Sequence, residues 1–122
     1  MKIRIKGNSI RMRITKTEVS QLCKTGYVQE ETHFLNKTFT YALSAKADEP
    51  TLTASFENDK ITLILPLDTI DGWEDSKKVG FSNLVSLEDG KTLSLLVEKD
   101  FTCLEDRGED ETDNYSNPKL QH

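Results

Sequence analysis

The feature that most constrains the fold of this chain is a two-residue alternation of apolar and polar side chains. The alternation covers residues 2–14, returns at Tyr27 and continues in short segments to residue 99. In an extended strand every second side chain points to the same face, so each such segment predicts a strand with one buried face. We expect eight strands, two within residues 2–14 and the others near residues 27–34, 38–44, 51–57, 60–65, 79–87 and 92–99.

The first two predicted strands form a hairpin, and their register depends on the position of the turn. A two-residue turn at residues 7–8 pairs Ile5 with Ile10, whereas a turn at residues 8–9 pairs Ile5 with Met12. Both registers keep the isoleucines and the methionine on one face. The sequence therefore predicts the hairpin and leaves the two registers open.

Two later turns also carry turn-forming residues. A turn between Glu57 and Lys60, through Asn-Asp, sets these two residues opposite each other. In the last hairpin we favour a three-residue loop with Gly90 in the left-handed conformation, which pairs Leu87 with Leu93.

One helix interrupts the strands. Thr15 and Glu18 fit a capping box, in which each side chain accepts a hydrogen bond from a backbone N–H at the helix start. Val19 and Leu22 share one face of this helix, and Gly26 is placed to end it after about ten residues. We expect no other regular helix, although an irregular helical turn fits the long connection from residue 68 to 78.

Together these elements predict an α+β fold that is predominantly antiparallel β. We expect an eight-stranded meander that curls into a barrel or half-barrel, because closure hides the edges of a sheet. The helix near the N-terminus would then close one mouth, and Trp73 would plug one end of the core. No internal repeat is visible in the sequence. We predict one globular domain over residues 1–104 and an acidic, flexible C-terminal tail over residues 105–122.

Charge is distributed unevenly along the chain. Residues 1–104 hold 14 Lys and Arg against 15 Asp and Glu, whereas residues 105–122 hold 2 and 6, so the tail carries most of the net charge of −5. The first 16 residues hold six cations and no acid. We predict an anion-binding surface from the hairpin cations Lys2, Arg4, Lys6, Arg11 and Arg13.

In either hairpin register these cations face one another, which is unfavourable by up to about 1 kcal/mol per pair, so a counter-charge is expected nearby. One source is solvent with acids of neighbouring strands such as Glu30, Glu31 or Glu57. A second source is the tail, with its acidic residues Glu105, Asp106, Glu109, Asp110, Glu111 and Asp113. The third is an external anion.

Several functional classes lack support in the residues. The two histidines and two cysteines have no metal-ligand spacing, no catalytic or phosphate-cradling motif is present, and we expect no cofactor. The N-terminus does not resemble a secretory signal, and no apolar run approaches the roughly 20 residues of a membrane span. We therefore expect a cytoplasmic protein with reduced cysteines. A pI near 5.0 without a recognised motif disfavours nucleic acid as a partner.

Three stretches resemble a family of short uncharacterised bacterial proteins. They are the opening from Lys2 to Thr15, the segment Glu98 to Leu104, and the acidic run that ends at Asn117-Pro118. The resemblance spans nearly the whole chain. It implies a compact bacterial domain and transfers no activity, cofactor or residue role.

These observations favour a small binding or interaction module whose basic N-terminal hairpin engages an anionic group. That group would be the protein's own acidic tail in cis or from a second copy, an acidic partner protein, or a phosphorylated ligand. One alternative is an enzyme for a phosphorylated substrate, with a basic barrel interior and a divalent metal held by acids. A structural or accessory protein is the third class. The lack of a catalytic signature favours the non-enzymatic classes.

Overall fold

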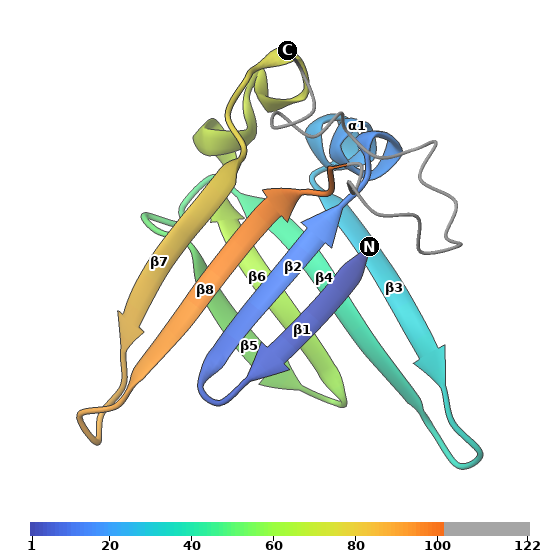
Figure 1. Ribbon diagram of the computed structural model, residues 1–122, viewed down its shortest axis with the longest axis vertical. Coiled ribbons are helices and arrows are strands. Elements are labelled where there is room, and N and C mark those ends of the chain that lie inside the picture. Colours follow the sequence, from blue (N-terminus) through green and yellow to red (C-terminus); the bar gives the residue numbers. More distant parts are fainter. Residues whose placement is uncertain (102–122) are drawn as a thin grey trace.

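The computed structural model describes residues 1–101 and contains all eight expected strands (Figure 1). In chain order the elements are β1 (Lys2–Lys6), β2 (Ser9–Ile14), α1 (Lys16–Thr25), β3 (Tyr27–His33), β4 (Thr38–Lys46), β5 (Thr53–Glu57), β6 (Lys60–Pro66), the 3₁₀ helices η1 (Leu67–Ile70) and η2 (Trp73–Asp75), β7 (Gly80–Ser86) and β8 (Thr92–Lys99). The fold is α+β, as expected from the alternation and the single capped helix.

The strands form two separate four-stranded sheets. Sheet A has the order β1-β2-β8-β7, and sheet B has the order β3-β4-β6-β5. The outer pairs of each sheet are antiparallel hairpins, but the central pairs β2–β8 and β4–β6 are parallel. The predicted meander and closed barrel are therefore wrong. Each sheet buries its apolar face against the other sheet, so a core forms without closure and each sheet keeps two edge strands.

Figure 1 shows sheet A in front of sheet B, with the strands of the two sheets running in crossing directions and with α1 and the 3₁₀ helices together at one end. The core lies between the layers and includes the fully buried side chains Met12, Ile14, Leu43, Leu63, Leu95 and Val97. Trp73, only 1% exposed, lies at the helical end with its ring against Phe81. The prediction that it plugs one end of the core is confirmed.

The structure selects one of the two registers left open for the first hairpin and confirms the predicted turn between Glu57 and Lys60. The first hairpin pairs Ile5 with Ile10, so its turn lies at residues 7–8. Gly7 has φ 54°, which suits glycine in the first central position of a hairpin turn. The turn between Glu57 and Lys60 is also as predicted, and its two central residues both have positive φ.

The last hairpin differs from the prediction by a shift of two residues. Gly90 is left-handed with φ 82°, as expected, and the N–H of Leu87 donates to the carbonyl of Lys91 at 2.8 Å. The loop is therefore residues 88–90, which pairs Leu93 with Val85 instead of Leu87. Leu93 and Val85 both pack against the core, whereas Leu87 is 38% exposed. The predicted three-residue loop is thus confirmed, and the predicted pair of Leu87 with Leu93 is wrong because a loop of that length joins Leu87 to Lys91.

The helix begins and ends where the sequence indicated. The Thr15 hydroxyl accepts from the N–H of Glu18, and the Glu18 carboxylate accepts from the N–H of Thr15 at 2.9 Å. Gly26 is left-handed, with φ 78°, and its N–H donates to the carbonyl of Leu22 at 2.8 Å. Glu18 also holds the N-terminal amine of Met1 at 2.7 Å, which ties the start of β1 to the helix.

The two halves of the chain repeat the same connectivity, although no repeat is visible in the sequence. Hairpin β1–β2, helix α1 and hairpin β3–β4 correspond to hairpin β5–β6, the 3₁₀ helices and hairpin β7–β8. The parallel registers match: Ser9 pairs with Ser94 as Lys60 pairs with Thr40. Matching backbone hydrogen bonds of 3.0 Å run from Ser94 to Asn8 and from Thr40 to Asp59.

None of the described helices is both long and apolar enough to span a membrane. The predicted acidic tail, residues 105–122, lies outside the described residues, as does Cys103.

Candidate functional site

The five predicted anion-binding residues lie together on the outer face of sheet A. Ile3 and Ile5 of β1 point toward the core side, so the alternate residues of the same strand point away from it. Lys2 pairs with Arg13 and Arg4 pairs with Arg11, whereas Lys6 pairs with Ser9. We call this surface the basic face, and its members are Lys2, Arg4, Lys6, Arg11 and Arg13.

Within residues 1–101 the counter-charge closest to the arginines of the basic face is Glu98 on β8, which sequence analysis missed. The carboxylate of Glu98 accepts from Arg13 Nε at 2.7 Å and lies 3.9 Å from Arg11 Nε. Glu98 stands next to Arg13 in the parallel pairing of β2 with β8. That pairing joins strands far apart in the chain, so no local pattern reveals it.

Two further residues, Gly80 and Asp100, lie close to Glu98 and Lys2. Gly80 of β7 lies opposite Glu98, and a Cβ at Gly80 would be 2.1 Å from the carbonyl oxygen of Val97 and 2.9 Å from the Cβ of Glu98. Only a residue without a side chain fits this close approach. Beyond the end of β8, the buried carboxylate of Asp100 lies 3.4 Å from Lys2 Nζ.

The acids proposed from sequence as neighbouring counter-charges lie elsewhere. Glu30 and Glu31 are on β3 and Glu57 is on β5, and both strands belong to sheet B. Among residues 1–101, ion pairs join the basic face only to Glu98 and Asp100. The tail acids Glu105, Asp106, Glu109, Asp110, Glu111 and Asp113 lie outside the described residues.

The basic face contains a depression of about 250 Å³ near the turn of the first hairpin. Its lining includes the cations Arg4, Lys6 and Arg11 and the hydroxyls of Ser9 and Ser94. Within the described part of the chain no ion pair involves Arg4 or Lys6. Guanidinium, ammonium and hydroxyl groups are all hydrogen-bond donors, so this depression is suited chemically to an anion.

Comparison of the two halves shows that the fold does not require these cations. At the equivalent places of hairpin β5–β6, Thr53 pairs with Ile64 and Ser55 pairs with Thr62. Glu57 stands where the first half has Lys6. One half of the same scaffold therefore forms its hairpin without a cationic face.

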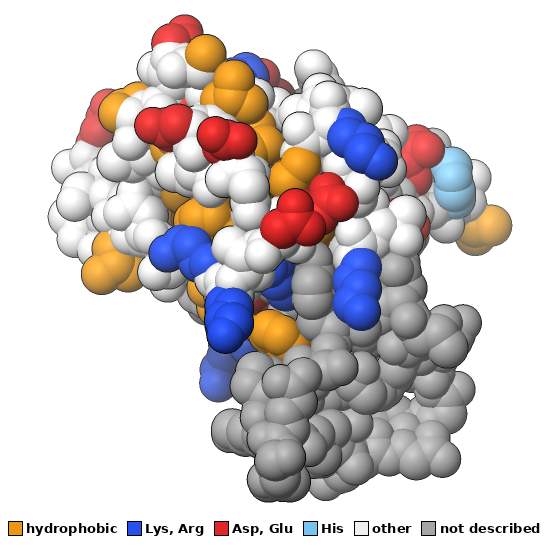
Figure 2. Space-filling view, turned by 90° about the horizontal axis from the view of Figure 1, so that it is seen from above, with side chains coloured by type: hydrophobic (Ala, Val, Ile, Leu, Met, Phe, Trp, Pro, Cys, Tyr) orange, Lys and Arg blue, Asp and Glu red, His pale blue; other side chains and the backbone are white. Residues whose placement is uncertain are grey.

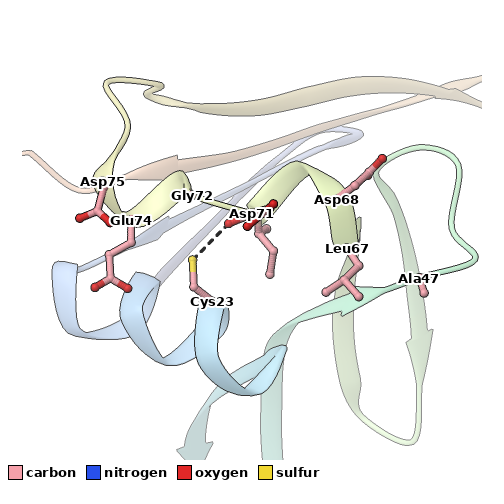
Figure 3. A pocket seen from close by; sticks show the side chains of 9 residues that line it. Cys23, Ala47, Leu67, Asp68, Asp71, Gly72, Glu74 and Asp75 are labelled. Atoms are coloured by element: carbon pink, nitrogen blue, oxygen red, sulfur yellow. Dashed lines mark hydrogen bonds between the residues drawn. The ribbon is translucent and has the colours of Figure 1, made fainter.

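A second depression, of about 540 Å³, lies at the helical end between α1, η1 and η2 (Figure 3). Its lining includes four carboxylates, Asp68, Asp71, Glu74 and Asp75. Figure 3 shows them spread around the depression and pointing in different directions. In residues 1–101 no three of the His, Cys, Asp and Glu side chains are placed so that they could hold one metal ion together. In the end-on view of Figure 2, acidic and apolar side chains are interspersed over this end of the molecule.

The same depression contains the Cys23 thiol. It donates to the carbonyl of Ile70 at 3.3 Å, and burial raises the pKa of the thiol. A higher pKa leaves less thiolate at neutral pH, and only the thiolate is a strong nucleophile. Cys23 is therefore poorly suited to nucleophilic catalysis here.

Lys99 at the end of β8 is 4% exposed and stabilises the helical end. Its Nζ donates to the carbonyl of Ser76 at 2.7 Å and lies 5.5 Å from the centre of the Trp73 ring. Burial lowers the pKa of the Lys99 amine. These contacts anchor the segment that carries η2 to the end of sheet A.

Comparison with known proteins assigns the chain to a family but to no activity. No curated protein and no solved structure gave a match. The model of a family of unknown function, DUF7009, matches residues 1–119, which is nearly the whole chain of 122. This agrees with the resemblance found in the opening strands and the C-terminal segment. The chain belongs to the DUF7009 family.

Proposed function

We propose that this protein is a small binding module that holds an anionic group on the basic face of sheet A. The observation that carries the proposal is the depression lined by Arg4, Lys6 and Arg11 together with two serine hydroxyls. A local cluster of cations attracts anions even when the whole chain is negatively charged, because the field near the cluster depends mainly on the nearest charges.

The local balance of charge supports the proposal. Glu98 is engaged closely by Arg13, at 2.7 Å, and lies much farther from Arg11, at 3.9 Å. Arg4 and Lys6 make no ion pair with any described residue. The basic face therefore keeps cationic groups available beside the depression, and an incoming anion would not first have to displace Glu98 from Arg13.

The alternative of a phosphate-substrate enzyme receives less support. It supposed that the cations line the interior of a barrel, but they lie on the outer face of sheet A, and the space between the sheets holds the apolar core. Among residues 1–101 the loop acids form no cluster suited to a metal ion, and the tail acids lie outside the described residues.

A binding assay at low ionic strength tests the proposal. The probes are inorganic triphosphate, poly-L-glutamate and heparin, each added to the full-length protein during thermal unfolding. At about 100 times its Kd, a ligand raises the stability of the folded state by about 2.7 kcal/mol. We expect at least one probe to raise Tm by several degrees, and added salt to reduce the shift.

Charge reversal locates the binding. Arg4→Glu places a carboxylate opposite Arg11, a favourable cross-strand pair, so the variant is expected to fold. It should lose most of the Tm shift. The control is Lys77→Glu, the same change of charge at an exposed residue in the loop before β7. Failure of every probe, or equal shifts in both variants, would contradict the proposal.

A further inference from the structure

β1 is an edge strand as well as part of the basic face. It stands at the end of sheet A and, among the described residues, its ladder partner is β2 alone. Four of its five residues are exposed, and the fifth, Ile3, is half-buried. An edge strand presents unpaired backbone N–H and C=O groups, which can pair with a further strand.

The register indicates which backbone groups lie on the outer edge. Pairs in an antiparallel ladder alternate between hydrogen-bonded and non-hydrogen-bonded. The two-residue turn makes Lys6 and Ser9 a hydrogen-bonded pair, so the N–H and C=O groups of Ile3 and Ile5 point away from β2. The outer edge of β1 therefore offers two sets of donors and acceptors for another strand.

The side chains of β1 differ sharply between its two faces. On the outer face, the cations Lys2, Arg4 and Lys6 follow one another at intervals of about 7 Å, the repeat of every second residue in a strand. On the core side, Ile3 packs against the core and Ile5 is 55% exposed. A strand added to this edge would place alternate side chains beside the cations and the others beside the isoleucines.

We infer that β1 is a docking strand for an extended segment of a partner protein in which acidic residues alternate with apolar ones. This inference rests on the proposed function and names its partner class. Backbone pairing with Ile3 and Ile5 would supply affinity, and the three cations would select acids at every second position. Either strand direction preserves this alternation.

Charge decides against a second copy of β1 as the occupant, because cations would face cations along the whole pair. Cations on an edge strand also prevent unwanted pairing with other strands, and this protection alone could account for some of the cations on β1. The equivalent edge strand β5 has Glu57 as its one charged residue, however, so this scaffold does not need three cations for protection. The additional cations on β1 therefore point to a role in selecting an acidic partner.

The test compares three short peptides binding to the full-length protein at low ionic strength, by fluorescence anisotropy. The first alternates three acids with valines. The second has the same composition with its acids consecutive, and the third is the first with its backbone nitrogens methylated, which removes the donors needed for pairing. We expect the alternating peptide to bind about tenfold more tightly than the second, equal to about 1.4 kcal/mol, and the methylated peptide to lose most binding.

Binding of the alternating peptide to variants of the protein then shows where the peptide binds. Arg4→Glu should weaken binding of the alternating peptide, and Lys77→Glu should leave it unchanged apart from a small long-range effect. Ile5→Pro removes an N–H that we place on the outer edge while keeping every cation, so it should weaken the alternating peptide and leave triphosphate binding intact. Thermal unfolding of each variant checks that the fold persists.

The remaining outcomes of these experiments would each overturn the inference, and each outcome identifies which part of it is wrong. Equal binding of the first two peptides would refute selection of alternating acids, and undiminished binding of the methylated peptide would refute strand pairing; both results leave the basic face as an anion site. Binding of triphosphate without either peptide would refute a protein partner. If the alternating peptide binds only a full-length variant with Glu109→Gln, Asp110→Asn, Glu111→Gln and Asp113→Asn, the protein's own acids are the occupant and not a partner. Failure of every anion would refute the proposed function as well.

Discussion

Replacement of Glu98 by glutamine should lower stability and raise anion affinity at the same time. The substitution keeps the size of the side chain and an oxygen that can accept from Arg13, but removes the negative charge that stands beside Arg13 at the border of the basic face. The five cations of that face would then retain only Asp100 as an acidic neighbour among residues 1–101. Stability falls because cation–cation repulsion is no longer offset.

The structure sets the size of the effect between two limits. Hydrogen bonds to charged groups contribute about 1.5–3 kcal/mol when shielded from water, whereas fully exposed ion pairs contribute about 0–1 kcal/mol. The Glu98 side chain is 17% exposed and that of Arg13 is 37% exposed, so the pair is intermediate. We expect Glu98→Gln to cost about 1–2 kcal/mol, which at about 4–8 °C per kcal/mol is a clear fall in Tm.

Urea unfolding at 0.1 M and 1 M NaCl measures the effect. The Debye length falls from about 10 Å to about 3 Å between these concentrations, so the loss of stability should shrink in high salt. The control is Glu57→Gln, the same chemical change on the equivalent edge strand of sheet B. In the low-salt binding assay, Glu98→Gln should bind the effective anionic probe more tightly than wild type does. Unchanged stability at both salt concentrations would refute the view that Glu98 neutralises the basic face.

Two further predictions concern the end of β8. Gly80→Ala should destabilise the fold by about 1–3 kcal/mol, because its Cβ would overlap the carbonyl oxygen of Val97, and Ser82→Ala two residues along β7 is the control in urea unfolding. The free energy of unfolding of Lys99→Met, relative to that of wild type, should fall as the pH rises. Burial lowers the pKa of Lys99 in the folded state, so the unfolded wild type binds more protons and wild-type stability rises with pH from the folded pKa toward about 10.5. Urea unfolding of both proteins between pH 7 and 10.5 measures the difference, and a difference independent of pH would contradict the assignment.

Sequence alone predicted those parts of the fold that depend on residues close together in the chain. The helix from Thr15 to Gly26 has signals at both ends, and the first hairpin follows from two alternating segments, although the sequence left its register open between two turns. The strands themselves follow from alternation, because each sheet has one face on the core. These features need no knowledge of distant partners.

The parts that sequence did not predict depend on strands far apart in the chain. Parallel pairing of β2 with β8 brings Glu98 to Arg13, and no local pattern in either strand names the other as its neighbour. For the same reason the two-sheet arrangement was mistaken for a meander. The wrong partner predicted for Leu93 has a different cause: the predicted three-residue loop is present, and with Leu87 joined to Lys91 it leaves Leu93 opposite Val85.

The placement of β8 in the middle of sheet A has a consequence for how the chain acquires its structure during synthesis. All four strands of sheet B lie within residues 27–66 and are available as soon as that segment has been made. Hairpin β1–β2 is made first, but its neighbour β8 is made last, and the bonded residues Arg13 and Glu98 are 85 positions apart. Contacts this distant in the chain form slowly, since a long loop must close before they contribute. The edge of β2 that pairs with β8 therefore stays without its neighbour until the final strand has been made.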